Sequence, residues 1–212
     1  MMTFWYRVCW WICRIGLFFW HPVFHVVGRN FVPAGRAVLC ANHSGCADAI
    51  WLLLALNSPK MCRIIAKKEL RSWPVVGWVM EKFRIIFVDR GAHSGTAYHE
   101  GVQALQNDEQ MMVFVEGTRC NKDKHVRAKT GSIRMAVEAD APVVPVFITR
   151  NKTPWCPVNV IFGEPYKIAP REEWTHEAYQ QEADELLRKI YRLGGDSYAD
   201  HIGEDSGLLL RR

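Results

Sequence analysis

Residues 39–50, with the sequence LCANHSGCADAI, place a histidine and an aspartate five positions apart among small and apolar side chains. On a continuous helix, five positions would turn two side chains roughly 140° away from each other. His43 and Asp48 can therefore meet only if the chain turns between them, and Ser44-Gly45 supplies such a turn.

Asp48 would then lie in the first turn of the next helix, where its carboxylate can accept a hydrogen bond from His43 Nδ1. That bond fixes the tautomer of the imidazole and leaves Nε2 free to take a proton. The spacing therefore allows a general base and the carboxylate that orients it, although this pair taken alone favours the alternative. The alternative is a helix cap next to an ordinary histidine at the end of a strand.

Polar and charged side chains also follow three further predicted strands. The sets are Lys67 with Lys68, Asp89 with Arg90, and Glu116-Gly117-Thr118-Arg119, after strands at 61–66, 84–88 and 111–115. Because ligands of parallel sheets bind at the carboxyl ends of the strands, we expect these groups to share one edge with His43. Gly117 permits a close backbone approach, Arg119 presents a fork suited to phosphate, and Lys67 adds a point charge. Such a site could hold a phosphorylated alcohol while His43 deprotonates its hydroxyl.

The elements that position these residues alternate between strand and helix patterns. Strands are expected at 23–27, 37–41, 61–66, 84–88, 111–115, 143–149 and 158–162, and helices at 48–57, 74–82, 94–106, 131–139 and 175–192. This alternation predicts a single α/β domain, in which a largely parallel mixed sheet is covered by helices on both faces. We expect the domain to span residues 23–196, with a loose C-terminal tail at 197–212.

The first 22 residues form the most apolar and aromatic segment of the chain. A spanning helix would place Arg14 near the centre of the bilayer at a cost of about 2.5–3.5 kcal/mol, and Pro22 interrupts the apolar run. Arg7 and Arg14 share one side of a helix whose other faces carry Trp, Phe, Ile and Leu. The pattern predicts a membrane-associating helical segment at 1–22 that lies in the interface, as in a peripheral or monotopic protein. A helix packed on the protein's own core is the alternative.

Charge and cysteine usage bear on the partners of the protein and on the compartment in which it resides. The net charge is +5, and four arginines precede Asp48, the first acidic residue. A basic front half suits an anionic partner, which can be a membrane surface, a phosphate ligand or nucleic acid. The seven cysteines show no C-x-x-C spacing, so we expect neither a disulfide framework nor a zinc site, and a reducing compartment is favoured.

The ordered blocks resemble those of the glycerolipid acyltransferases, the lysophosphatidic acid acyltransferase group. NHSGCAD is similar to that family's N-H-x-x-x-x-D motif, and FVEGTR at 114–119 resembles its F-P-E-G-T-R. AKKEL at 66–70, IFVDR at 86–90 and APVVPVFI at 141–148 resemble its other blocks, in the family's order. Val115 stands where the family usually has proline, which bears on the identity of the substrate more than on the chemistry.

The resemblance implies transfer of a fatty acyl group from acyl-CoA or acyl-carrier protein to lysophosphatidic acid, which gives phosphatidic acid. His43 would be the general base and Asp48 the group that orients it. The residues implied to serve the phosphate of the acceptor are Lys67, Arg90, Glu116, Gly117, Thr118 and Arg119. No cofactor, no metal and no nucleic-acid partner are implied. We expect a phospholipid membrane as a partner and a location at its cytoplasmic face through the N-terminal segment.

Three alternatives stay open. The same chemistry could act on glycerol-3-phosphate or another lysophospholipid. His43, Asp48, Asp89 and Glu116 could instead be ligands of a divalent metal in a phosphohydrolase. The chain could also be a membrane-surface protein without catalytic activity.

Overall fold

The computed structural model describes residues 2–58, 62–82, 85–88, 95–120, 126–196 and 202. The helices are α1 (Met2–Trp20), α2 (Asp48–Leu56), α3 (Pro74–Lys82), α4 (Gly95–Gln106), α5 (Gly131–Glu138) and α6 (His176–Leu193), with 3-10 turns at Arg29–Phe31 and Lys68–Ser72. The strands are β1 (Phe24–Val27), β2 (Ala37–Ala41), β3 (Cys62–Lys67), β4 (Ile86–Val88), β5 (Gln110–Phe114), β6 (Val143–Ile148) and β7 (Val158–Phe162). Apart from Ile202, the predicted tail at 197–212 lies outside the described residues.

The seven described strands form one sheet in the order β1-β7-β6-β2-β5-β3-β4. Every neighbouring pair is parallel except β6 and β7, which run antiparallel. The prediction of a largely parallel mixed sheet is therefore confirmed. β2, which carries the residues before His43, lies inside the sheet between β5 and β6.

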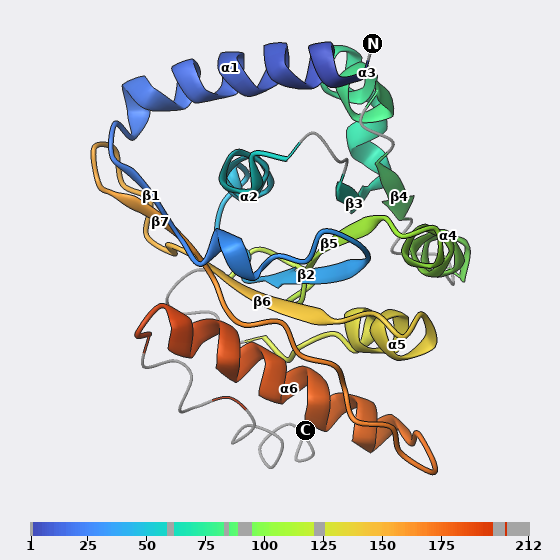
Figure 1. Cartoon of the computed structure of the whole chain (residues 1–212). Coiled ribbons are helices and arrows are strands. Elements are labelled where there is room, and N and C mark those ends of the chain that lie inside the picture. The colour runs from blue at the N-terminus through green and yellow to red at the C-terminus, as the bar shows by residue number, and fades with distance from the viewer. Residues whose placement is uncertain are drawn as a thin grey trace, which may run out of the picture.

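Helices cover both faces of the sheet, as the sequence predicts (Figure 1). α1 and α2 lie on one side, while α5 and α6 lie on the other. A hydrophobic core lies on each face of the sheet, and β2 contributes side chains to both. Leu39 packs with α2 on one face, and Cys40 packs with α4, α5 and α6 on the other. All five residues of β2 are fully buried, so this continuous apolar run is explained by helices on both sides.

The N-terminal segment is a single helix, α1, with two different faces. Trp10, Cys13 and Leu17 pack against the core beside α2. The opposite face leaves large apolar side chains exposed: Phe4, Trp11, Ile12, Ile15, Phe18 and Phe19. One face of α1 thus packs on the protein, and the other exposes large apolar side chains to solvent. The interfacial role of this exposed face stays a prediction. No helix in the described part of the chain is long and apolar enough to cross a membrane.

The end of α1 is bonded to the segment between β6 and β7. The backbone N–H of Trp155 donates to the carbonyl of Trp20 at 2.8 Å, and Nδ1 of the buried His21 donates to the carbonyl of Cys156 at 3.0 Å. This segment therefore links α1 to the carboxyl end of β6.

The register of the central strands brings three strand ends to one place. Ala41 of β2 lies opposite Phe114 of β5 and Val146 of β6. The buried Asn42 extends this alignment, since its side chain donates to the carbonyl of Ile148 at 2.8 Å and accepts from the N–H of Ile148 at 2.7 Å. The residues after β2, β5 and β6 consequently meet at one edge of the sheet.

Replacement of Asn42 by alanine should lower the free energy of unfolding by about 2–4 kcal/mol, because two buried backbone groups of Ile148 lose their partner. Urea denaturation followed by circular dichroism measures this change. The exposed Asn30 provides the matched control, and Asn30→Ala should change stability by less than about 0.5 kcal/mol. Equal stability of the two variants would contradict the role assigned to Asn42.

Candidate active site

His43 and Asp48 form the hydrogen bond that their spacing predicts. Nδ1 of His43 lies 2.9 Å from Oδ2 of Asp48. The turn at Ser44-Gly45 makes this possible, and Asp48 is the first residue of α2. Because a carboxylate only accepts hydrogen bonds, the proton on Nδ1 is fixed and Nε2 is the nitrogen left to act as a base. The aspartate is fully buried, whereas the His43 side chain remains 21% exposed.

The Asp48 carboxylate has further partners besides His43. Its Oδ2 also accepts from the backbone N–H of Ser44 at 2.6 Å and of Gly45 at 2.8 Å. Its Oδ1 forms an ion pair with the ammonium of Lys152 at 2.8 Å. Burial alone would raise the pKa of Asp48, but the hydrogen bond from His43 and the positive charge of Lys152 outweigh it and hold the pKa below its usual value. The carboxylate is therefore ionised when His43 acts.

Neighbouring groups fix the backbone and the ring of His43. Its N–H donates to Oε2 of Glu116 at 2.7 Å, and its carbonyl accepts from the N–H of Cys120 at 2.7 Å. The imidazole stacks on the ring of Phe114, with the ring centroids 4.2 Å apart and the planes inclined by 21°. Contacts on the backbone, on Nδ1 and on one face of the ring leave few ways for the imidazole to move.

Glu116, the first residue of the Glu-Gly-Thr-Arg turn, is buried among protein groups. One carboxylate oxygen accepts from the N–H of His43, and the other accepts from the hydroxyl of Tyr191 on α6. Burial raises the pKa of Glu116 above its usual value, although these two bonds and the charge of Arg150 favour the ionised form. In this structure the side chain braces His43, and its assignment to the acceptor phosphate stays a prediction.

The rest of the turn lies beside the histidine loop. Arg119 is exposed, and its Nη1 donates to Sγ of Cys46 at 2.7 Å, which places the guanidinium against residues 43–48. Gly117 has φ of +66°, a conformation that an L side chain rarely adopts, and a Cβ there would lie 2.9 Å from Cγ of Lys129. Thr118 is half-buried next to Arg119.

The other predicted phosphate ligands are spread more widely. Lys67 is the exposed last residue of β3, and β5 separates this strand from β2. Arg90 and Asp89 lie outside the described residues. The structure thus brings His43, Asp48, Glu116 and Arg119 together, while the phosphate-binding roles of Lys67, Arg90, Gly117, Thr118 and Arg119 stay predictions.

Two residues of this site were not predicted. Tyr191 approaches from α6, and nothing in its local sequence indicates that contact. Lys152 follows β6 by four positions, so the rule that selected the residues after four other strands would also have selected this loop.

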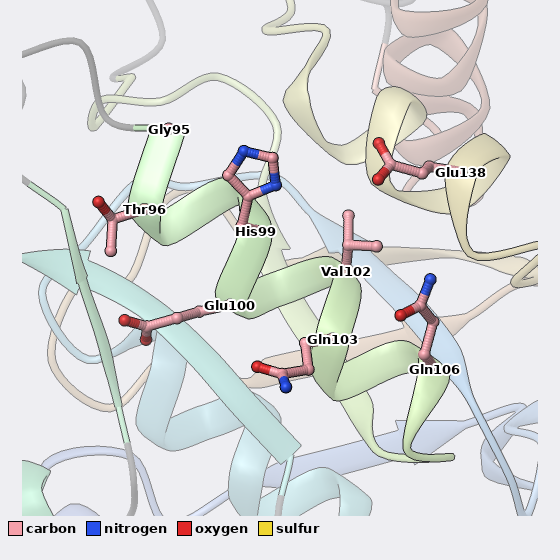
Figure 2. Close-up of a pocket in the computed structure, with 8 residues that line it drawn as sticks. All are labelled: Gly95, Thr96, His99, Glu100, Val102, Gln103, Gln106 and Glu138. Carbon is pink, nitrogen blue, oxygen red and sulfur yellow. The ribbon is translucent and has the colours of Figure 1, made fainter.

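Two further features of the surface lie apart from this cluster. Figure 2 shows a groove lined by α4 residues and by Glu138 of α5, with His99 and Glu100 among them, and none of its residues contacts His43 or Asp48 in a recorded hydrogen bond or ion pair. Within the part of the chain that the structure describes, no group of three or more His, Cys, Asp or Glu side chains is arranged to hold a metal ion. The cation recorded at Asp48 is the Lys152 ammonium.

Residues 23–149, more than half of the chain, match the acyltransferase family, and this range contains both His43 and the Glu-Gly-Thr-Arg turn. The chain belongs to the acyltransferase family. The resemblance read from the motifs is thereby confirmed.

Relatives of this acyltransferase family member carry a more specific description. The chain is 28% identical to the 1-acyl-sn-glycerol-3-phosphate acyltransferase of Saccharomyces cerevisiae over 65% of this chain and 46% of that protein. It is 30% identical to the human 1-acyl-sn-glycerol-3-phosphate acyltransferase beta over 64% of this chain and 50% of that protein. The chain spans about half the length of these relatives.

A solved structure supports the same family. The crystal structure of the 1-acyl-sn-glycerophosphate acyltransferase PlsC from Thermotoga maritima is similar with a TM-score of 0.61 and 27% identity. The similarity covers 81% of this chain and 72% of that chain. It confirms the α/β fold that the sequence predicts for this family member.

The raised pKa of Glu116 predicts a specific pH dependence. From its ordinary value of 4.5 upward, the folded protein holds the Glu116 proton more tightly than the unfolded chain does. The free energy of unfolding of the wild type should therefore fall, relative to that of Glu116→Gln, as pH rises from about 4.5 through the folded pKa. Denaturation of both proteins at a series of pH values measures the difference.

Glu172→Gln, at an exposed position, supplies the control for removal of a surface carboxylate. A wild-type stability that rises relative to Glu116→Gln over the same range would show that the buried carboxylate is ionised more easily than in the unfolded chain.

Proposed function

We propose that this protein is an O-acyltransferase that moves a fatty acyl group from acyl-CoA or acyl-carrier protein to the free hydroxyl of lysophosphatidic acid. The product is phosphatidic acid. The observation that carries the proposal is the 2.9 Å contact between His43 Nδ1 and a buried, ionised Asp48, at the edge where β2, β5 and β6 end. The family and the names of the relatives support the class of acceptor.

The reaction needs a base and an orienting group, and this site offers both. Nε2 of His43 takes the proton of the acceptor hydroxyl as its oxygen attacks the carbonyl carbon of the thioester. The carbon–sulfur bond breaks, the acyl group becomes an ester of the acceptor, and the thiolate leaves with the proton returned from the imidazolium. Asp48 stabilises that imidazolium through Nδ1. No enzyme nucleophile and no cofactor are required, because the donor is a substrate.

The acceptor phosphate is assigned to Arg119 and the turn before it, together with Lys67 and Arg90. Arg119 lies against Cys46 in the histidine loop, so its guanidinium is near the base and is exposed to a ligand. Thr118 and the backbone of Gly117, which has a positive φ, lie next to it. Lys67 and Arg90 complete the proposed set of phosphate-binding residues. A planar guanidinium binds two phosphate oxygens at once, which fixes the distance between phosphate and hydroxyl.

The exposed face of α1 is assigned to a phospholipid membrane. Its Trp, Phe and Ile side chains are the composition that enters the bilayer interface, and the exposed Arg7 can reach lipid phosphates. A protein held there by one helix meets an acceptor that itself resides in the bilayer. The basic N-terminal half supports the assignment of this surface to the anionic cytoplasmic leaflet.

Thiol release measures the proposed chemistry directly. The purified protein, given acyl-CoA and lysophosphatidic acid in vesicles, should release free thiol and form phosphatidic acid. His43→Ala should abolish this release, and Asp48→Asn should lower it by about 10²–10⁴-fold, because the tautomer and the charge are both lost. Arg119→Lys should raise the KM for the acceptor more than it lowers kcat.

His99→Ala, on the α4 groove, is the matched histidine control and should leave the rate unchanged. Parallel reactions with glycerol-3-phosphate and other lysophospholipids identify the acceptor, and acyl-carrier protein replaces acyl-CoA to identify the donor. Unchanged thiol release in His43→Ala would overturn the mechanism. Phosphate release without any thioester, lost on chelation, would instead indicate a phosphohydrolase.

Membrane binding by α1 is tested with vesicles. Serine at Trp11, Ile15 and Phe18, which share the exposed face, should weaken partition into phosphatidylglycerol vesicles by at least about tenfold, since each side chain buries apolar area in the interface. Co-sedimentation measures the partition. Val27→Ser removes an exposed apolar residue of β1 and should leave it unchanged. Equal partition of the triple variant and the wild type would refute the assignment.

A further inference from the structure

The Lys152 side chain is almost buried, and protein groups surround its ammonium. Its side chain is 10% exposed, and the ammonium lies 2.8 Å from Oδ1 of Asp48. It also donates to Oγ of Ser44 at 2.7 Å and to the carbonyl of Thr149 at 2.5 Å. The ammonium thus makes two hydrogen bonds and one ion pair. Burial of a lysine is costly unless it is paired in this way.

These contacts complete the environment of the Asp48 carboxylate. Oδ2 accepts from His43 and from the backbone of residues 44 and 45, while Oδ1 is held by Lys152 from a different strand end. A carboxylate bonded at both oxygens cannot rotate away from the imidazole. The ammonium also offsets part of the negative charge that the imidazole faces, which limits how strongly Asp48 favours the imidazolium.

We propose that Lys152 is a positioning residue for acyl transfer: it locks the orientation of Asp48 toward His43 and tunes the charge that the imidazole experiences. The proposal rests on the assignment of His43 as the general base. Lys152 itself contacts no reacting atom and acts through Asp48.

Other charged groups around the pair remain in place when Lys152 is changed. Glu116 contacts the backbone of His43 and is paired with the Tyr191 hydroxyl. Arg150, in the same loop, lies over the Tyr191 ring and forms an ion pair with Asp196 at 3.3 Å. Arg119 contacts Cys46 on the other side of the histidine loop. A change in the pH–rate profile that follows the charge at position 152 therefore reports the Lys152 ammonium.

The experiment uses three substitutions in the full-length chain with vesicles containing lysophosphatidic acid. Lys152→Met removes the charge and the donors, Lys152→Gln keeps a donor without the charge, and Lys152→Arg keeps both. In Lys152→Met and Lys152→Gln, kcat per folded protein should fall about tenfold or more with KM changed less than about twofold, because misorientation of the base affects the reaction step. The acid limb of the rate profile should move to higher pH by about one unit in these two variants, and should remain within about 0.3 unit of the wild type in Lys152→Arg.

Lys167 provides a matched control, since its ammonium forms an exposed ion pair with Asp140 at 2.7 Å, away from the cluster. Lys167→Met should leave kcat and the acid limb unchanged. Circular dichroism supplies the folded fraction. If Lys152→Met does not fold, the test is the comparison of Lys152→Gln with Lys152→Arg, since both variants keep donors but differ in charge.

The outcomes separate this proposal from the proposed function. Wild-type thiol release that is lost in His43→Ala, together with an unmoved acid limb and normal kcat in Lys152→Gln, would overturn the role of Lys152 alone. Loss of stability with unchanged kcat per folded protein would show that the ion pair is only structural, and would also overturn it. Thiol release that survives in His43→Ala would overturn the general base and, with it, both proposals.

Discussion

The candidate site depends on one buried carboxylate. Asp48 has no exposed surface, and four donors converge on it: the His43 imidazole, the backbone N–H groups of residues 44 and 45, and the Lys152 ammonium. Such a charge is tolerated in the interior only when hydrogen bonds and an opposite charge compensate the lost hydration. The turn after β2, the start of α2 and the loop after β6 must all be in place for that compensation. The same requirement that stabilises the carboxylate thus fixes the imidazole.

The sheet supplies the rigidity that the carboxylate needs. β2 is flanked by parallel strands on both sides and covered by helices on both faces, so its carboxyl end has little freedom. Asn42 joins that end to Ile148 through two hydrogen bonds, and Glu116 joins His43 to α6 through Tyr191. Such a framework can hold reactive side chains at strand ends in precise positions, even where the loop that carries them is not itself rigid.

Most of the fold could be predicted from the sequence because its local signals agree with one another. Buried strands read as short apolar runs, α6 reads as an amphipathic helix, and Thr175 accepts a hydrogen bond from the N–H of Ala178 as a helix cap should. His43 and Asp48 were predictable for the same reason, since their contact is local and needs only the turn between them. The basic, apolar character of α1 was equally plain in its residues.

Contacts between distant parts of the chain were harder to predict. Lys152 lies 108 residues from Ser44, and Tyr191 lies 75 residues from Glu116. The strand-end rule selects the loop after β6 but does not indicate which of its side chains reaches Asp48, and nothing in the local sequence indicates Tyr191. Glu116 illustrates the difficulty, because a motif glutamate at a strand end suggests a ligand while its observed partners are protein groups. Only the packing of α6 and of the loop after β6 decides these contacts.

The bond between α1 and the loop after β6 has a practical consequence. Removal of the apolar helix is an obvious way to make such a protein easier to handle in water. Here the shortened chain would lose the Trp20 carbonyl that holds Trp155, and a cut beyond His21 would also release Cys156. The same loop carries Lys152 to Asp48. A truncated protein that is well behaved in solution would then report on a loosened reaction centre rather than on the native one.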